Sequence, residues 1–298
     1  MHLYSAFGLQ IDSDTPIFLL NKNKLLREEI SPNVRIINNE ALELPLQNYT
    51  QDIFTHATGM NTLFYRKEIG IFNITKERIE YKKSRDCTDH DFFRVLLSLP
   101  VGYCLMYNNN LVVHASAVSK NGNASLFIGK SGMGKSVLAY QLIEKGFKFL
   151  SEDICAVTEK NFVQPSMPFV KLSDEFINDN FQKTYKLNSD KRGRKGLFIN
   201  QNKFLESAQK IKNIFIFKNS AYDACEIADL TKKQSLPLIF KNSFKSLPLL
   251  NDKEFDEQVI NRILNLNEEV NFYSVLYSSN RYQERNEKIE IIISEQLE

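Results

Sequence analysis

The sequence predicts a protein of the α/β class, α+β overall, with a β-rich N-terminal region ahead of an α/β domain. Three observations predict this fold class. Residues 1 to about 85 carry alternating or β-branched runs separated by turn residues, as strands do. After residue 110, strand-like and helix-like segments mix. Between two of them, the glycine-rich stretch GKSGMGKS follows an apolar run and precedes a helical pattern.

The first region is predicted to contain strands in LYSAFGLQID, NVRIINN and IGIFNITKERIEYKK, with a hairpin turn at NITKER. The next stretch, TDHDFFRVLLSLPVGYCLMY, predicts one helix that begins at Thr88 or Asp89 and runs to the Asn-rich break at 108–110. We therefore expect residues 1–108 to form the β-rich N-terminal region and residues 109–298 to form the second domain.

The second domain is predicted to open with a β-hairpin. LVVHASAV and ASLFIG flank Asn121-Gly122, and Asn-Gly between two apolar runs is a strong hairpin signal. A two-residue turn pairs residues whose numbers sum to 243, which sets His114 opposite Gly129, and a three-residue turn shifts the pairing by one. Either register brings His114 to the mouth of the glycine-rich stretch.

Further along, KNIFIFKN (212–219) and VNFYSVLYS (270–278) predict strands, and DKEFDEQVINRILNL (252–266) predicts an amphipathic helix. The final KIEIIISEQ fits either a strand or a helix.

The composition is that of an ordinary soluble protein, with 298 residues, a net charge of +2 and 25% charged residues. Neither nucleic acid nor a membrane is needed as a partner. The N-terminus lacks the pattern of a signal peptide, and the longest apolar run, residues 95–107, is too short to cross a bilayer. The four cysteines include no C-x-x-C pair and suit a reducing compartment, so we expect a cytoplasmic protein (Cys87, Cys104, Cys155 and Cys225).

The stretch from Gly129 to Ser136 matches G-x-x-x-x-G-K-[ST], the P-loop pattern. Its glycines let backbone N–H groups turn onto phosphate oxygens at a helix N-terminus. Lys135 is expected to reach the β- and γ-phosphates, and the Ser136 hydroxyl to bind Mg²⁺. The alternative is a glycine-rich turn that binds nothing. The expected nucleotide contacts are Gly129, Lys130, Ser131, Gly132, Met133, Gly134, Lys135, Ser136 and Val137.

An acidic pair, Glu152-Asp153, follows the loop after an unusually short interval. KSVLAYQLIEK predicts a helix of roughly 16 Å that stops at Gly146. FKFLS then predicts a short strand, parallel to the strand before the loop, whose carboxyl end brings the pair to the phosphate side. One carboxylate could hold Mg²⁺ and the other accept a proton, or the pair could be a plain acidic turn.

The combination HASAV, GKSGMGKS and GFKFLSEDICAV resembles the catalytic domain of HPr kinase/phosphorylase. It looks most like the stand-alone HPr-kinase-like serine kinases, including those of lasso-peptide and other modified-peptide gene clusters, which also begin with a YxAFGLxIxS-like strand. The resemblance covers most of the chain, but only residues 111–157 are specific. It implies the fold of HPr kinase and phosphoenolpyruvate carboxykinase, and ATP- and Mg²⁺-dependent phosphorylation of a serine.

By this resemblance, Ser136 and Asp153 hold the metal and Glu152 is the general base, with His114 beside that carboxylate to orient or tune it. The family usually has Asp-Asp where this chain has Glu152-Asp153, and the longer glutamate must sit further back. Phosphorylase activity does not follow from the resemblance.

Two further segments are candidates for the site. QPSMPFVKL (164–172) resembles a family segment that borders the active site. KRGRKG (191–196) is either a solvated basic loop or a phosphate or peptide clamp, in which Arg192 would contact phosphate.

The leading hypothesis is a kinase for a serine of a peptide or protein, which could be a ribosomal peptide precursor. A small-molecule kinase on the same scaffold is the second, and a non-catalytic nucleotide-sensing or assembly module is the third. No N-K-x-D motif is present, which disfavours a GTPase. Related kinases are often oligomeric, so a homo-oligomer is expected.

Overall fold

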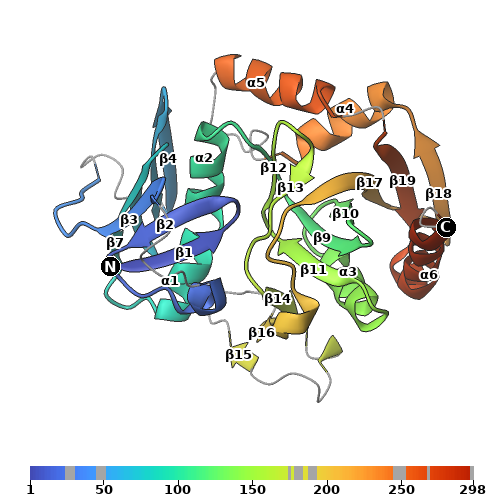
Figure 1. Ribbon diagram of the computed structural model, residues 1–298, viewed down its shortest axis with the longest axis horizontal. Coiled ribbons are helices and arrows are strands. Elements are labelled where there is room, and N and C mark those ends of the chain that lie inside the picture. The colour runs from blue at the N-terminus through green and yellow to red at the C-terminus, as the bar shows by residue number, and fades with distance from the viewer. Residues whose placement is uncertain are drawn as a thin grey trace.

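The computed structural model describes residues 1–23, 31–44, 52–173, 176–177, 184–186, 193–243, 253–266 and 269–295. Within these residues the chain is a mixed α/β protein, as the sequence predicts, and its strands form three sheets of seven, nine and three strands. Figure 1 shows the seven-stranded sheet at one end of the molecule and the nine-stranded sheet at the centre and the other end.

The N-terminal sheet contains every strand predicted there. Its order is β1-β2-β3-β7-β6-β5-β4. LYSAFGLQID folds as two strands, since Phe7 and Gly8 both have positive φ and turn the chain. The strands β4 and β5 were not predicted. The bounds are β1 His2–Ala6, β2 Leu9–Ser13, β3 Val34–Asn38, β4 Ile53–Thr58, β5 Asn61–Arg66, β6 Gly70–Thr75 and β7 Arg78–Lys83, with a 3-10 helix at Phe18–Asn23.

The prediction of a single helix after this sheet is wrong. The segment forms two helices, α1 (Asp89–Leu96) and α2 (Leu99–Tyr107). Thr88 caps α1 as expected, accepting from the backbone N–H of Asp91. The break follows from Pro100, which has no N–H to continue α1 but fits the first turn of a new helix. The hydroxyl of Ser98 accepts from the N–H of Leu99 and caps α2.

The central sheet has the order β11-β9-β10-β17-β13-β12-β8, and β19 pairs with both β17 and β18. The predicted strands at 212–219 and 270–278 are confirmed as parts of β17 and β19. The bounds are β8 Leu111–Val113, β9 Ala115–Lys120, β10 Asn123–Ile128, β11 Lys148–Glu152, β12 Cys155–Val157, β13 Phe162–Val163, β17 Gln209–Asn219, β18 Cys225–Leu230 and β19 Asn271–Tyr277.

The predicted hairpin register is confirmed. Asn121 and Gly122 have φ of 51° and 82°, the two positive values of a type I′ turn. Lys120 pairs with Asn123 and Ala115 with Ile128, so each pair sums to 243. This register sets His114 and Gly129 beside each other, just past the ends of β9 and β10.

The strand directions bring the loop and the acidic pair to one edge of the sheet. β9 is antiparallel to β10 and to β11, so β10 and β11 run the same way with β9 between them. α3 (Lys135–Glu144) makes the crossover, and Gly146 has the left-handed φ that ends it. The carboxyl ends of β10 and β11 therefore lie on the same edge, where ligands bind in open α/β sheets.

A small third sheet lies beside this edge, with β14 (Phe169–Leu172) paired to β16 (Lys195–Phe198) and β16 to β15 (Thr184–Lys186). The C-terminal part adds α4 (Lys232–Lys241), α5 (Lys253–Leu264) and α6 (Tyr282–Glu295), with 3-10 helices at Gln201–Lys203 and Ser279–Arg281. α5 confirms the predicted helix, and residues 288–295 of the ambiguous KIEIIISEQ belong to α6. Figure 1 shows α6 beside β18 and β19.

One hydrophobic cluster contains residues from both sides of residue 108. β10 is buried on both faces: Leu126 and Ile128 pack in the cluster that also contains the N-terminal sheet, while Phe127 packs in a second cluster with α3 and α6. α2 ends at Tyr107, next to the predicted boundary, and contacts β6 and β7 on one side and β8 on the other. No helix among the described residues is long and apolar enough to cross a membrane.

Candidate active site

The glycine-rich loop, residues 129–134, connects β10 to α3. Gly132 and Gly134 have φ of 92° and 68°, which glycine adopts without steric cost. Gly134 is the N-cap of α3 and gives no side-chain hydrogen bond to the first turn. The N–H groups of that turn therefore lack a capping partner, and they lie at the positive end of the helix dipole. This end of α3 is suited to an anion.

Lys135, the first residue of α3, lies inside the curve of this loop. Its Nζ donates to the carbonyl oxygens of Gly129 at 2.7 Å and Lys130 at 3.1 Å. The side chain is buried, and burial lowers the pKa of its ammonium to about 8. At neutral pH it still carries a positive charge, and its hydrogen bonds within the described part of the chain go to backbone carbonyls.

Glu152 lies at the end of β11 and accepts a hydrogen bond from Ser136, the residue after Lys135. The Ser136 hydroxyl donates to Oε1 of Glu152 at 2.5 Å, and the backbone N–H of Lys171 donates to Oε2 at 3.1 Å. Glu152 is buried, and burial raises the pKa of its carboxyl to about 7. The sequence analysis expected Ser136 to act with Asp153, but the structure pairs it with Glu152, since the longer glutamate reaches the helix.

Asp153 has a different environment from its neighbour. Its φ of 65° is in the left-handed region, so its side chain leaves the strand in another direction and forms an ion pair with Lys171. Burial acts to raise the pKa of Asp153, but the Lys171 ammonium and then His114 outweigh it and hold the pKa well below its usual range. The pKa values of the two adjacent carboxyl groups are thus shifted in opposite directions.

His114 contacts Asp153 and not Glu152, which differs from the expected orienting role. Its Nδ1 lies 2.9 Å from the backbone carbonyl oxygen of Asp153. A carbonyl only accepts, so Nδ1 carries the proton and donates. Burial, followed by the nearby Lys135 charge, lowers the pKa of His114 below its ordinary value. At neutral pH the ring is neutral and holds the backbone of Asp153 in its left-handed conformation.

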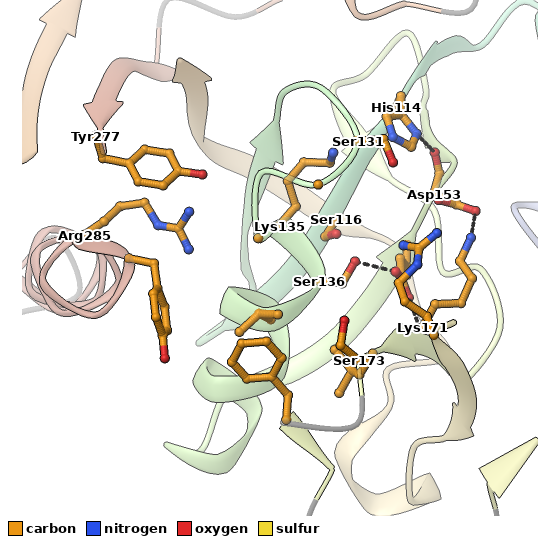
Figure 2. Close-up of a pocket in the computed structure, with 18 of the residues that line it drawn as sticks. His114, Ser116, Ser131, Lys135, Ser136, Asp153, Lys171, Ser173, Tyr277 and Arg285 are labelled. Carbon is orange, nitrogen blue, oxygen red and sulfur yellow. Dashed lines mark hydrogen bonds and ion pairs between the residues drawn. The ribbon is translucent and has the colours of Figure 1, made fainter. Parts of the chain in front are cut away.

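These residues line one cavity of about 430 Å³, drawn in Figure 2. Lys135 and Ser136 lie near the centre, and His114, Asp153 and Lys171 lie together on one side. Tyr277 and Arg285 lie on the opposite side, on the strand and helix of the C-terminal part. The cavity therefore has an acidic side with a histidine and a side with aromatic rings and a guanidinium. Phe176 and Tyr282 also line it, in an edge-to-face pair with centroids 6.1 Å apart.

A second cavity of about 310 Å³ adjoins the acidic side. Among the described residues it shares only His114 and Asp153 with the first, so these two residues lie between the two spaces. The first residues of the loop, the start of α2, the end of α4 and the residue after Asp153 complete its lining (Gly129, Lys130, Ser98, Leu99, Lys241, Asn242, Ser243 and Ile154).

The structure brings most of the predicted site residues to these two cavities. Six residues of the loop and the start of α3 line the first cavity: Ser131, Gly132, Gly134, Lys135, Ser136 and Val137. Met133 is instead buried in the second hydrophobic cluster. Of the basic segment, Arg194 lines the first cavity, whereas Arg192 and Lys191 lie outside the described residues.

Three prominent residues of the first cavity were missed: Lys171, Tyr277 and Arg285. Lys171 lies in segment 164–172, which the resemblance predicts to border the site, and a charged residue within its apolar run is the available signal. Tyr277 ends a strand that the sequence predicted, and Arg285 lies in the charged first part of α6. Neither has a local pattern that indicates a site.

The first cavity contains oxygen ligands of the kind that the magnesium ion implied by the loop motif prefers. Among the described residues, no group of three or more His, Cys, Asp or Glu side chains could hold a metal ion by itself. Mg²⁺ in phosphate-handling sites needs only one or two carboxylates besides phosphate and water oxygens. The hydroxyl of Ser136 and the carboxylates of Glu152 and Asp153 are oxygen ligands of this kind, so the residues present fit Mg²⁺ bound together with a nucleotide.

No family model and no curated protein matches the sequence. The matching solved structures include one described as the Hpr(Ser) kinase/phosphatase from Coxiella burnetii. It is 13% identical, the match covers 62% of this chain and 89% of that chain, and the TM-score is 0.31.

Proposed function

We propose that this chain is a kinase that uses ATP and Mg²⁺ to phosphorylate a serine hydroxyl of a peptide or protein. One observation carries the proposal: Lys135 and Ser136, at the N-terminus of α3, share a cavity with Glu152 and Asp153. The first pair, with the N–H groups of the loop, suits phosphate groups. The second pair supplies a metal ligand and a proton acceptor.

The glycine-rich loop would hold the triphosphate. Backbone N–H groups of the loop and of the first turn of α3 would bind the β- and γ-phosphates. Lys135 would exchange the carbonyls of Gly129 and Lys130 for phosphate oxygens and balance the negative charge that develops during transfer.

Ser136 and Asp153 would hold the metal ion, which when bound neutralises charge on the β- and γ-phosphate oxygens. Both side chains have other partners in the structure, Glu152 and Lys171 respectively. Releasing the Ser136 hydroxyl would leave Oε1 of Glu152 free to accept from a substrate.

Glu152 would act as the general base. The acceptor hydroxyl attacks the γ-phosphorus in line, its proton passes to Glu152, an O–P bond forms, and the bond to the bridging oxygen breaks to release ADP. A base is most effective when its pKa is near the working pH, and burial raises the pKa of Glu152 to about 7. The opposite pKa shift of Asp153 keeps that carboxylate charged for a cation.

A peptide or protein acceptor needs its own approach to the acidic pair. The second cavity reaches one member of this pair, Asp153, together with His114, from outside the first cavity, and it supports such an approach. This is the reason to favour transfer to an acceptor over simple hydrolysis of ATP.

The test is a phosphate-transfer assay with labelled ATP and Mg²⁺ against serine-containing peptides, a cell lysate and small alcohols. Wild type is compared with Lys135→Ala and Glu152→Gln, and with Lys210→Ala as a control. Lys210 is an exposed lysine paired with Glu269 near the start of β17, the end of the strand opposite to Asn219, which lines the cavity. We expect labelling of a serine peptide by wild type and by the control, and its loss in the two site variants.

The same assay separates the alternatives. Labelling confined to small alcohols would replace the peptide kinase with a small-molecule kinase. ATP binding without transfer to any acceptor would contradict the kinase and favour a nucleotide-sensing module.

A further inference from the structure

Arg285 is fully buried although it carries a charge, and it reaches the glycine-rich loop from the far end of the chain. Its Nη1 donates to the carbonyl oxygen of Met133 at 2.9 Å. The guanidinium lies over the rings of Phe217 and Tyr277, with its central carbon 4.8 Å and 4.3 Å from their centroids. Its other hydrogen bonds go to the side-chain oxygen of Asn286. Within the described residues it forms no ion pair with a carboxylate, so structural charge pairing does not explain its position.

Tyr277 contacts the same atom of the loop. Its hydroxyl donates to the carbonyl oxygen of Met133 at 2.7 Å, so that oxygen accepts from two buried donors. Figure 2 shows the ring of Tyr277 and the guanidinium of Arg285 side by side at one wall of the cavity. A carbonyl with two lone pairs is saturated by two donors, and its direction is therefore fixed.

Fixing this carbonyl also fixes the next N–H group. The described chain has no cis peptide bond, and in a trans peptide the C=O and N–H point in opposite directions. With the Met133 carbonyl held toward Arg285 and Tyr277, the N–H of Gly134 points away from them. Gly134 is the N-cap of α3, so its N–H lies next to the free N–H groups at the N-terminus of the helix.

The guanidinium of Arg285 lies close to the backbone of Gly134. A Cβ at Gly134 would lie 3.0 Å from Nη2 and 3.2 Å from Nη1 of Arg285. The guanidinium therefore packs directly against this glycine. α6 also contacts α3 further along, through the Asn286 amide and Gln141 and through the ion pair of Lys145 with Glu290.

We propose that Arg285 and Tyr277 are positioning residues for phosphate binding: by holding the Met133 carbonyl they aim the Gly134 N–H at the phosphate of the bound nucleotide. This inference rests on the proposed nucleotide-binding function and adds residues that no motif assigns. A hydrogen bond to a charged group contributes enough that misdirecting it should weaken phosphate binding about tenfold. Binding of the acceptor should be unaffected.

The experiment measures the binding of inorganic pyrophosphate and of Mg-ATP by calorimetry to wild type, Tyr277→Phe and Arg285→Lys. Tyr277→Phe removes one donor and keeps every charge. Arg285→Lys keeps the charge and removes the planar guanidinium. Glu290→Gln is the control, since it breaks a contact of α6 with α3 away from the loop. Lys135→Ala tests the nucleotide site itself. The amide resonance of Gly134 is followed by NMR during each pyrophosphate titration.

We expect weaker pyrophosphate and Mg-ATP binding in both variants, about tenfold for Arg285→Lys, and unchanged binding in Glu290→Gln. The KM for Mg-ATP should rise while the KM for the acceptor stays constant. The Gly134 amide should shift with pyrophosphate in wild type and lose that shift in the variants, which a general loss of stability would not produce.

Wild-type binding by both variants would overturn the inference, even if Lys135→Ala confirms the nucleotide site. If Arg285→Lys does not fold, Tyr277→Phe decides alone, because unchanged pyrophosphate affinity and an unchanged Gly134 shift would contradict the positioning role. No binding of either ligand by the wild type would overturn the proposed function, and this inference with it.

Discussion

The side chain of Lys171 forms an ion pair with Asp153, and its backbone N–H donates to Oε2 of Glu152. A single residue of β14 thus contacts both members of the acidic pair. Its ammonium lowers the pKa of both carboxyl groups, and its N–H also stabilises the charged form of Glu152. At Asp153 the ion pair outweighs burial and the pKa falls, whereas at Glu152 burial outweighs the ammonium and the pKa rises.

Replacing Lys171 by Met should destabilise the protein by about 1–3 kcal/mol at pH 7, because it leaves a partly buried carboxylate without its partner. The depressed pKa of Asp153 sets the pH dependence. Its stabilising effect is present above the ordinary pKa of an aspartate and is lost as the pH falls through the lower folded value. The difference from wild type should therefore shrink from pH 7 to pH 3 in urea unfolding.

The matched control is Lys210→Met, which breaks an ion pair with Glu269 whose two side chains are about half exposed or more. Exposed pairs contribute less than about 1 kcal/mol, so this variant should stay close to wild type. Equal losses in the two variants would contradict the special role of Lys171.

The parts of the fold that the sequence predicts are those with local signals. The Asn121-Gly122 turn fixes its own hairpin register, and the loop motif gives its strand, its glycines and its helix over about twenty consecutive residues. These signals were enough to bring His114, Lys135 and the acidic pair to one edge of the sheet.

The residues that complete the site depend on contacts that no local pattern encodes. Arg285 meets Met133 across 152 positions of the chain, and Lys171 meets Asp153 across 18. The pairing of Ser136 with Glu152 depends on one methylene and on the left-handed backbone of Asp153, which turns the second carboxylate away. Tertiary packing, and not the local sequence, determines these contacts.

Gly134→Ala should destabilise the protein more than Gly146→Ala does. Both glycines have left-handed φ, 68° and 90°, so both substitutions incur a backbone cost of about 1–2 kcal/mol. At Gly146 the new Cβ would meet nothing within 4 Å, whereas at Gly134 it would lie 3.0 Å from Arg285. We expect an additional loss of about 1 kcal/mol or more at Gly134, measured by urea unfolding of the ligand-free protein.

Gly146→Ala serves as the internal reference. Gly146 lies at the other end of the same helix, so its substitution brings the same backbone strain without a close contact for the new Cβ. If both variants lost the same stability, the guanidinium would not be packed against the loop as described.

Glu152→Gln should make the ligand-free protein more stable at pH 8 and have little effect near pH 4.5. Burial raises the folded-state pKa of Glu152 to about 7, above the ordinary value of 4.5. Between these two values the folded protein binds the proton more tightly than the unfolded chain, so wild-type stability falls as the pH rises through this range. The amide does not titrate and avoids this loss.

The gain in unfolding free energy of Glu152→Gln over wild type should appear between pH 4.5 and 7. It should level off above pH 7 and reach at most about 3 kcal/mol. It is measured by urea unfolding of both proteins with a chelator present, so that no cation neutralises the carboxylate. Glu226→Gln, at an exposed position on β18, is the reference for a carboxylate in water. A pH-independent difference between Glu152→Gln and wild type would mean that Glu152 is ionised at little cost, and its fitness as a general base would then have to come from the bound substrate instead of from burial.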